Sequence, residues 1–250
     1  MKNYSLQLYS VRNVLDEDYD ATLKAISDMG YDGVEFAGQY GGYTGKELKE
    51  KLDFYGLTPV SAHLSYEELQ NNFDYHAEIL KDIGCKMIVC SYLKPETIEE
   101  AEKFGEWLVK IAEKCIMNSF EFGYHNHAHE FEVNDENSNT AFDIMMDIGD
   151  PLVLAELDLG WVAKAGKNPD EYIRKYAGRV TYLHLKQFKP NADGEDKIST
   201  LSNGILDVKS AIKTGKLMGC EHFIVEQDVP ETDELSDAKA NIEYLKSLKV

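Results

Sequence analysis

The stretch DYDATLKAISDMGYDGVEFA (residues 18–37) contains the structural unit that decides the fold. Its first part places apolar residues at three- and four-residue spacing, which predicts an amphipathic helix. Gly30 follows this pattern, and glycine most easily takes the left-handed conformation in which many helices end. The β-rich run GVEFA (33–37) comes next. The stretch therefore predicts a helix that ends near Gly30 and leads into a buried strand.

Seven further β-rich runs alternate with helical patterns along the chain. They are YSLQLYS (4–10), TPVSAHL (58–64), KMIVCSY (86–92), FEFGYHNH (120–127), LVLAELD (152–158), VTYLHLK (180–186) and HFIVEQD (222–228). A glycine or an asparagine stands near each of the seven helix-to-strand joints, at Gly30, Gly56, Gly84, Asn118, Gly149, Gly178 and Gly219. We expect these residues to end their helices in the left-handed conformation.

Strands separated by helices of this length pair in parallel through right-handed crossovers. Eight such units in 250 residues predict a single (β/α)8 TIM barrel, with residues 1–250 forming one domain. A doubly wound open sheet is the alternative. Such a sheet usually carries a glycine-rich strand-to-helix turn, but neither G-x-G-x-x-G nor G-x-x-x-x-G-K-[ST] occurs in the chain.

The composition limits the classes of partner. The apolar share of 43% and the charged share of 28% are ordinary for a globular protein, whereas the net charge of −19 is strongly acidic. Because an acidic surface repels a phosphate backbone, we expect no nucleic-acid partner. Four cysteines without a C-x-x-C pair indicate free thiols in a reducing compartment. Without a signal-peptide pattern or a run of about 18 apolar residues, we expect a cytoplasmic protein with no membrane partner.

Ionisable side chains gather at the ends of the predicted strands, where a (β/α)8 barrel carries its chemistry. Alternate residues of a strand share a face, so four strands each present a pair of such groups to one side. The pairs are His125 and His127, Glu156 and Asp158, His184 and Lys186, and Glu226 and Asp228. Glu35 and His63 lie on the second and third strands. At other strand ends we interpret Tyr9 and Tyr92 as packing residues.

A cluster of carboxylates and imidazoles without an arginine is typical of a divalent-cation site. Burying these charges is costly unless a partner or a metal compensates for them. Oxygen and nitrogen ligands together suit Mn²⁺, Co²⁺, Zn²⁺, Mg²⁺ or Fe²⁺, and the sequence does not choose among them. Because no cysteine belongs to the cluster, a closed structural zinc site is disfavoured. We therefore expect one divalent metal ion at the carboxyl ends of the strands.

At these residues the sequence resembles the xylose isomerase-like barrel superfamily, which includes sugar isomerases and epimerases, inosose dehydratase and endonuclease IV repair enzymes. The resemblance covers nearly the whole chain and is strongest in YHNHAHEF (124–131), ELDLGWVAKAGKNP (156–169), GRVTYLHLKQ (178–187) and FIVEQD (223–228). It implies a sugar or polyol as substrate. It also implies metal ligands at Asp158, His184 and Glu226, with a fourth ligand from strand five that is either His125, which we prefer, or a folded-back Glu130.

The chain departs from the family pattern at three positions. His125 replaces the strand-five glutamate of the sugar epimerases, which puts a symmetrical two-glutamate mechanism in doubt. Trp161 stands where the family often has a substrate-binding histidine, and we expect its ring to pack against the apolar face of a sugar. Gln187 replaces an aspartate that often follows the H-x-K pattern.

The resemblance implies proton removal next to a carbonyl, with the metal stabilising the enediolate that forms. Glu226 would be a ligand and the base, and Glu156 or His127 the partner acid. The substrate-binding candidates besides Trp161 are Lys186, Glu35 and His63. Lys186 would stabilise an oxyanion or remain solvated near the rim, and the other two would bind hydroxyls or form structural ion pairs.

A sugar isomerase or epimerase is the first functional interpretation, and a lyase or dehydratase acting on an inosose or 3-keto sugar is the alternative. The tandem histidines of YHNH (124–127) favour the dehydratase. A catalytically inactive metal-binding barrel is a third interpretation. The net charge of −19 argues against a DNA-repair nuclease of the endonuclease IV type. Beyond Lys186 and Lys189, no basic cluster lies near the predicted mouth of the barrel. We therefore do not expect a phosphorylated substrate. The long connection from Gln187 to Ile205 would cover ligand or meet a partner subunit, since the related enzymes are often homo-oligomers.

Overall fold

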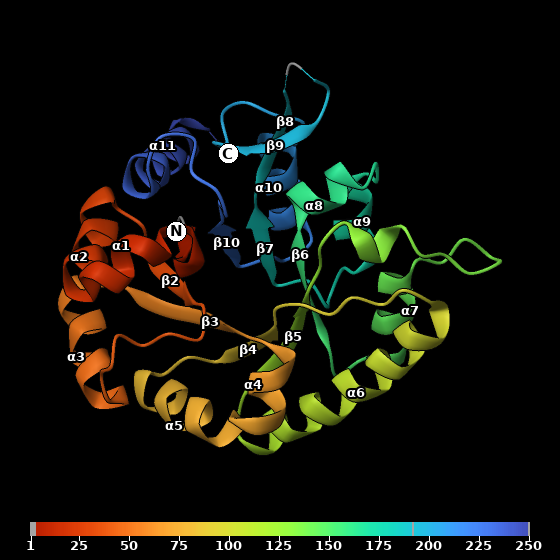
Figure 1. The fold of residues 1–250 in the computed structure, drawn as a ribbon, viewed down its shortest axis with the longest axis horizontal. Coiled ribbons are helices and arrows are strands. Elements are labelled where there is room, and N and C mark those ends of the chain that lie inside the picture. The colour runs from red at the N-terminus through yellow and green to blue at the C-terminus, as the bar shows by residue number, and fades with distance from the viewer. Residues whose placement is uncertain (1–3, 192, 250) are drawn as a thin grey trace.

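Eight parallel strands close into a barrel in the computed structural model, which describes residues 4–191 and 193–249 (Figure 1). The strands follow one another in chain order, and β1 pairs with β10 to close the barrel. Their bounds are β1 Tyr4–Gln7, β2 Gly33–Phe36, β3 Thr58–Leu64, β4 Met87–Cys90, β5 Glu121–His125, β6 Leu154–Asp158, β7 Tyr182–Leu185 and β10 His222–Val225. The predicted single (β/α)8 barrel is confirmed, and the open-sheet alternative is wrong.

The helices form a ring around the strands (Figure 1). They are α1 Arg12–Glu17, α2 Tyr19–Met29, α3 Gly45–Tyr55, α4 Tyr66–Asn71, α5 Phe73–Ile83, α6 Ile98–Met117, α7 Ala141–Ile148, α8 Leu159–Lys164, α9 Pro169–Lys175, α10 Val208–Leu217 and α11 Glu234–Ser247, with short 3-10 turns η1 Leu8–Val11 and η2 His129–Phe131. Within the described part of the chain, none of these helices combines the length and apolarity that crossing a bilayer requires.

The helix-to-strand joints follow the sequence expectation at five of seven positions. Gly30, Gly56, Gly84, Gly178 and Gly219 all have positive φ angles between 67° and 89°.

The other two joints differ from the expectation. Asn118 has a φ of −98°, and its neighbour Ser119 takes the left-handed conformation instead, with a φ of 67°. Gly149 has a φ of −72°, which any residue can adopt. A Cβ atom at Gly149 would lie 2.8 Å from the Cβ of Val153, so space rather than backbone conformation requires glycine there.

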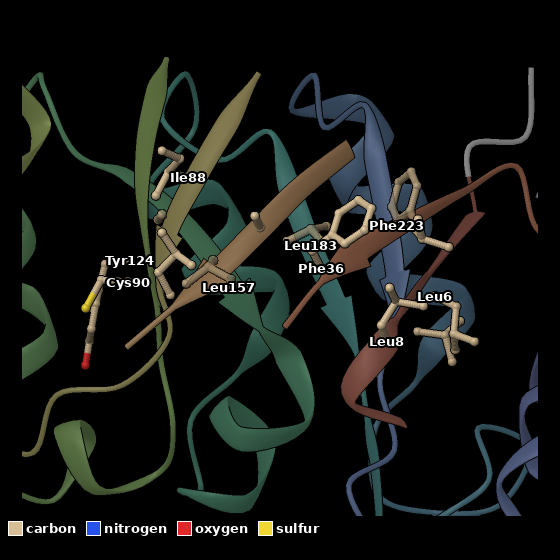
Figure 2. Packing of buried hydrophobic residues seen from close by; sticks show 14 of the residues in the cluster. Leu6, Leu8, Phe36, Ile88, Cys90, Tyr124, Leu157, Leu183 and Phe223 are labelled. Atoms are coloured by element: carbon tan, nitrogen blue, oxygen red, sulfur yellow. The ribbon is translucent and has the colours of Figure 1, made fainter. Parts of the chain in front are cut away.

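Alternation along the strands separates an apolar outer face from a polar inner face. On β6, Leu157 belongs to the main apolar core, whereas its neighbours Glu156 and Asp158 are buried polar residues. On β7, Leu183 belongs to the same core and His184 does not. Figure 2 shows Leu157 and Leu183 among the residues of this core. The helices therefore cover the apolar face, and the ionisable side chains occupy the barrel interior.

A second, smaller apolar cluster fills the barrel interior beneath these polar groups. Its members are Val60, Met87, Val89, Tyr182 and Ile224. The hydroxyl of Tyr182 on β7 donates to the backbone carbonyl of Val60 on β3 at 3.3 Å, so the cluster spans the barrel. Tyr182 and His184 are two residues apart on β7 and share its inner face. The polar cluster therefore rests on an apolar floor.

The connection after β7 is not the plain loop that we expected, because it contains an antiparallel hairpin of β8 Gln187–Pro190 and β9 Asp196–Ser199 (Figure 1). Gln187 fixes this connection at its base. Its Nε2 donates to the carbonyls of Leu201 and Leu206, and its Oε1 accepts the backbone N–H of Leu206 at 2.8 Å. The departure at Gln187 from the family pattern thus has a structural role in this chain.

Candidate metal centre and substrate cavity

Asp158 ends β6 and is held in place by its neighbours. Its Oδ1 accepts the backbone N–H of Trp161 at 2.9 Å and caps α8. The side chain of Asn126 accepts the backbone N–H of Asp158 at 3.0 Å and donates to its carbonyl at 3.2 Å. A Cβ at Gly160 would collide with the backbone of Lys186, so glycine lets α8 approach β7. The position of the Asp158 carboxylate is therefore fixed before any ligand binds.

Residues at the carboxyl ends of the neighbouring strands β5, β6, β7 and β10 meet at Asp158. We call His125, Asp158, His184 and Glu226 the cavity-side set, because two of its members line the cavity described below. Each residue offers one ligand atom, and these atoms all lie within 4.8 Å of one another. Nδ1 of His184 lies 3.1 Å from a carboxylate oxygen of Glu226. The structure thus brings together the four residues that the sequence analysis selects as ligands.

A second group of possible ligands lies behind the first and consists of His63, His125, Glu156 and His184. Both groups share His125 and His184, which use different ring nitrogens on the two sides. Nδ1 of His125 and Nε2 of His184 each lie 3.3 Å from Oε2 of Glu156. Their other nitrogens face Asp158 and Glu226. A histidine with one nitrogen free for a metal and the other beside a carboxylate is common in metal sites.

The cavity-side set fits a divalent cation better than the second group does. Oδ2 of Asp158 is buried and makes no hydrogen bond. The ammonium of Lys186 lies 3.3 Å from this oxygen and balances part of its charge, and a divalent cation would give the oxygen a direct ligand bond. Two imidazoles and two carboxylates are also a mixed donor set that suits a transition metal. Glu226 and His125 line the cavity whereas Glu156 does not, so a small molecule can reach a cation held by the cavity-side set.

Glu35 lies beneath the histidines and is fully buried. It accepts a hydrogen bond from Gln7 at 2.7 Å and another from Ser61, and Nε2 of His184 lies 2.8 Å from its Oε1. Glu35 is not among the described residues that line the cavity, whereas His63 is. The structure therefore favours a structural ion pair for Glu35 over contact with substrate.

The buried groups compensate for one another's charge. Burial and the charge of Glu156 raise the pKa of Glu35. Burial opposes the charge of Glu156, but His184 and His63 outweigh it and hold the pKa of that carboxyl well below its usual range. Burial likewise opposes a proton on His184, but Glu35 and Glu156 raise its pKa well above the usual value. Ion pairing thus makes this arrangement of buried charges tolerable.

The two strand-five histidines are neutral at physiological pH. Burial and the neighbouring His184 lower the pKa of His125 to about 4. Burial and the neighbouring His125 lower the pKa of His127 to about 2. Neutral imidazole is the form that binds a metal, so His125 needs no deprotonation at pH 7. For the same reason His127 is not a charged proton donor at that pH.

Lys186 is buried to 1% exposure, so it is not the solvated lysine that the sequence analysis considered. Its ammonium group lies 2.9 Å from Glu226, 3.3 Å from Asp158 and 3.0 Å from Asp228. Sequence reasoning placed Asp228 at a strand end but did not select it as a site residue. Its two-residue spacing from Glu226 was the available signal. Burial and the charge of Glu226 raise the pKa of Asp228 to about 6.

A cavity of about 620 Å³ opens above the cavity-side set. Its described lining is Tyr9, Ala37, Gly38, His63, Leu64, Ser65, Glu68, Ser91, Tyr92, His125, His127, Glu226 and Asp228. Tyr9 packs against Arg12 and Tyr92 against His127 and His129, but both rings are nearly half exposed, at 44% and 46%, and also line the cavity. Sequence reasoning missed Glu68 and Ser65 because they lie on or next to α4, beyond the end of a strand.

Two further candidates lie elsewhere than expected. The ring of Trp161 packs 4.6 Å from Phe188 and 5.4 Å from His127, and Trp161 is not among the described residues of the cavity lining. Glu130 accepts hydrogen bonds from the hydroxyl of Tyr124 at 2.6 Å and from the backbone N–H of His127 at 3.0 Å. The strand-five member of the cavity-side set is thus His125, and Glu130 supports the turn that follows.

The chain is similar to known proteins in both sequence and structure. A family model described as "Xylose isomerase-like TIM barrel" matches residues 23–248. An inosose dehydratase of Geobacillus kaustophilus is 27% identical over 235 residues, which cover 82% of this chain and 73% of that protein.

Two solved structures share the fold over nearly their full lengths. A sugar phosphate isomerase/epimerase from Parabacteroides distasonis has a TM-score of 0.84 at 22% identity, covering 99% of each chain. The IOLI protein, whose structure contains a zinc atom, has a TM-score of 0.80 at 16% identity, covering 99% of this chain and 98% of that one.

Proposed function

The chain belongs to the xylose isomerase-like TIM barrel family, and on that premise we propose that it is a metal-dependent dehydratase of a polyhydroxylated ketone such as an inosose. One observation carries the proposal. Two imidazoles and two carboxylates bring their ligand atoms within 4.8 Å of one another at the floor of a cavity, and a third carboxylate, Asp228, lines the cavity beside them. The first of the relatives, from Geobacillus kaustophilus, is an inosose dehydratase.

We propose that His125, Asp158, His184 and Glu226 hold one divalent cation. The zinc atom in the structure of the IOLI protein, which shares the fold, supports a metal in this barrel without fixing its identity here. Such a cation would act as a Lewis acid that stabilises negative charge on the carbonyl oxygen of the substrate. Glu156, which lies beside one nitrogen of each histidine, would orient both rings.

The carboxylates at the cavity floor can supply the proton transfers of a dehydration. Glu226 would remove a proton from the carbon next to the carbonyl, and Asp228 would give a proton to the hydroxyl that leaves from the adjacent carbon as water. The ammonium of Lys186 contacts both carboxylates. A proton can therefore return from Glu226 to Asp228 through Lys186, which restores the starting state and leaves an unsaturated ketone and one water.

The strand-five residue supports the proposal of a dehydratase over that of an epimerase. An epimerase that inverts a carbon needs a proton-transfer group on each face of the substrate. His125 occupies the place of one such glutamate, and its neutral ring faces Asp158 and Glu156. An elimination needs one base and one nearby acid, and Glu226 and Asp228 both line the cavity and both contact Lys186.

A sugar isomerase or epimerase remains the second candidate. Both reactions begin with the same proton removal, so the proposed roles of Glu226 and of the metal ligands apply to either. The fold shared with a sugar phosphate isomerase/epimerase of Parabacteroides distasonis supports this second candidate.

Mass spectrometry of purified protein loaded with Mn²⁺, Co²⁺ or Zn²⁺ tests the proposal on inosose, D-fructose and a 3-keto-glucoside. We expect inosose to lose the mass of one water and to give a product that absorbs in the near ultraviolet. Glu226→Gln should lower the rate at least about a hundredfold, since a proton-transfer group contributes roughly 10²–10⁴-fold. The matched control is Glu221→Gln, a carboxylate just before β10.

The possible outcomes separate the candidate functions. A mass-neutral conversion with solvent deuterium in the product would replace the dehydratase by an isomerase or epimerase. Stoichiometric metal binding without turnover of any of the three compounds would support an inactive metal-binding barrel instead.

A further inference from the structure

Glu68 on α4 also lines the cavity, far along the sequence from the cavity-side set. Oε2 of Glu68 lies 2.5 Å from Nε2 of His76 and accepts a hydrogen bond from Nδ2 of Asn72 at 3.0 Å. His76 is buried on α5, and its Nδ1 lies 2.8 Å from the hydroxyl of Tyr40. Three segments of the chain therefore hold one carboxylate at the cavity.

The donor and the acceptor of each hydrogen bond from Tyr40 through His76 to Glu68 can be assigned. Burial raises the pKa of the Tyr40 phenol above its usual value, so the phenol keeps its proton and can donate a hydrogen bond to Nδ1 of neutral His76. Nε2 of His76 then carries the hydrogen and donates to Glu68. The hydrogen bonds from His76 and Asn72 hold the pKa of Glu68 below its usual value. Glu68 is thus an ionised hydrogen-bond acceptor at neutral pH.

The described lining of the cavity contains three carboxylates, Glu68, Glu226 and Asp228, and no lysine or arginine. Two cations that contact lining residues are already engaged. Lys186 is buried among carboxylates, and Arg12 stacks over the ring of Tyr9 and donates to the backbone carbonyls of Tyr9 and Asp228. A phosphate or carboxylate on the part of a ligand that meets Glu68 would therefore face negative charge, with no lysine or arginine in the described lining to pair with it.

We propose that Glu68, held by His76 and Tyr40, is a specificity-determining residue that accepts hydrogen bonds from hydroxyls of an uncharged polyol and disfavours phosphorylated substrates. The proposal rests on the proposed function, because it concerns the far end of the same substrate. Carboxylates accept hydrogen bonds only, and their bonds to hydroxyls are stronger than neutral ones. Half-exposed Tyr9 and Tyr92 in the same lining offer ring faces on which a polyol can pack.

Calorimetric binding of myo-inositol and myo-inositol 1-phosphate tests this role without turnover, because neither compound has a carbonyl. For the purified wild-type protein, with its metal content recorded, we expect myo-inositol to bind at least about tenfold more tightly than myo-inositol 1-phosphate. Glu68→Gln should weaken myo-inositol binding about tenfold. It should also bring the dissociation constants of the two compounds closer together. Tyr40→Phe should weaken it in the same direction but less, since only the support of His76 is lost.

The matched control is Glu67→Gln, which removes the same charge from an exposed position of the same helix and should change neither dissociation constant. Tighter binding of the phosphate ester by the wild type would overturn the proposal, as would equal effects of Glu67→Gln and Glu68→Gln. With inosose as substrate, Glu68→Gln should raise KM and leave kcat nearly unchanged. Absence of all turnover would contradict the proposed dehydratase, while the binding comparison would still decide the role of Glu68.

Discussion

At the scale of single residues, the candidate centre depends on histidines that face two ways. His125 and His184 each turn one ring nitrogen toward the cavity-side set and the other toward Glu156. Sequence spacing placed Glu156 two residues before Asp158 on one strand and suggested a catalytic acid. The structure buries Glu156 completely, beneath the imidazoles and outside the described lining of the cavity. Its position suits a group that orients ligands rather than one that touches substrate.

We therefore expect Glu156→Gln to weaken binding of Zn²⁺ or Mn²⁺ by roughly 10–100-fold, because the carboxylate that fixes both rings is lost. Competition with a chromogenic chelator measures the affinity. Asp158→Ala, which removes a proposed ligand, should abolish stoichiometric binding. The matched control is Glu121→Gln, an exposed carboxylate at the start of β5. Unchanged affinity in Glu156→Gln would show that the imidazoles need no such support, and retained metal in Asp158→Ala would refute the ligand assignment.

At the scale of elements, α7 and α9 are joined by one buried carboxylate. Asp143 forms a capping box with Thr140 at the start of α7. It also accepts a hydrogen bond from the hydroxyl of Tyr176 at 2.6 Å and pairs with Lys175 at 2.8 Å. Burial opposes the charge of Asp143, but Lys175 and Tyr176 outweigh it and hold its pKa below the usual value. The charged carboxylate therefore stabilises the contact between the two helices.

Asp143→Asn should lower the free energy of unfolding at neutral pH by about 1–3 kcal/mol, the range for a hydrogen bond to a charged group and for a buried group left unsatisfied. Because the pKa is depressed in the folded state, this stabilisation is present above the unfolded pKa of about 3.9 and is lost as pH falls through the lower folded value. Urea unfolding of both proteins between neutral pH and about pH 3 measures the difference.

Asp147→Asn, at an exposed position of α7, is the matched control and should have little effect at any pH. If the difference between the wild type and Asp143→Asn stayed constant as the pH fell, the charge of Asp143 would not be the cause.

At the scale of the whole molecule, repulsion among the excess negative charges lowers the stability of the folded state. The chain carries a net charge of −19, and like charges repel one another more strongly in the folded state than in the expanded chain. Raising NaCl from about 10 mM to about 150 mM shortens the Debye length from about 30 Å to about 8 Å. We expect the midpoint of thermal unfolding to rise by a few degrees, since about 1 kcal/mol corresponds to roughly 2–4 °C at this size.

Differential scanning calorimetry of the metal-free protein measures this shift. Choline chloride at the same ionic strength should have the same effect, because screening does not depend on the identity of the cation. A fall of the midpoint with salt would show that attractive surface pairs outweigh the net repulsion.

The architecture and the four residues of the cavity-side set could be predicted from the sequence alone. Helical and strand periodicities are local properties, and eight repeats of one unit leave a closed parallel barrel as the favoured arrangement. Once the barrel closes, the ends of β5, β6, β7 and β10 must meet, which is why His125, Asp158, His184 and Glu226 could be selected together. The glycine joints show the limit of this reasoning, since Gly149 is required by its contact with Val153 and not by its backbone angles.

The tertiary structure decided what each selected group does. Lys186 is buried among carboxylates, Glu35 is paired below the cavity, and Trp161 packs on Phe188, although their spacing along the strands and turns gives no sign of these differences. Burial, ring orientation and choice of partner depend on segments that approach only when the barrel closes. Glu68, supported by His76 and Tyr40, is the clearest case, because contacts between separate helices and loops leave no periodic pattern in the chain.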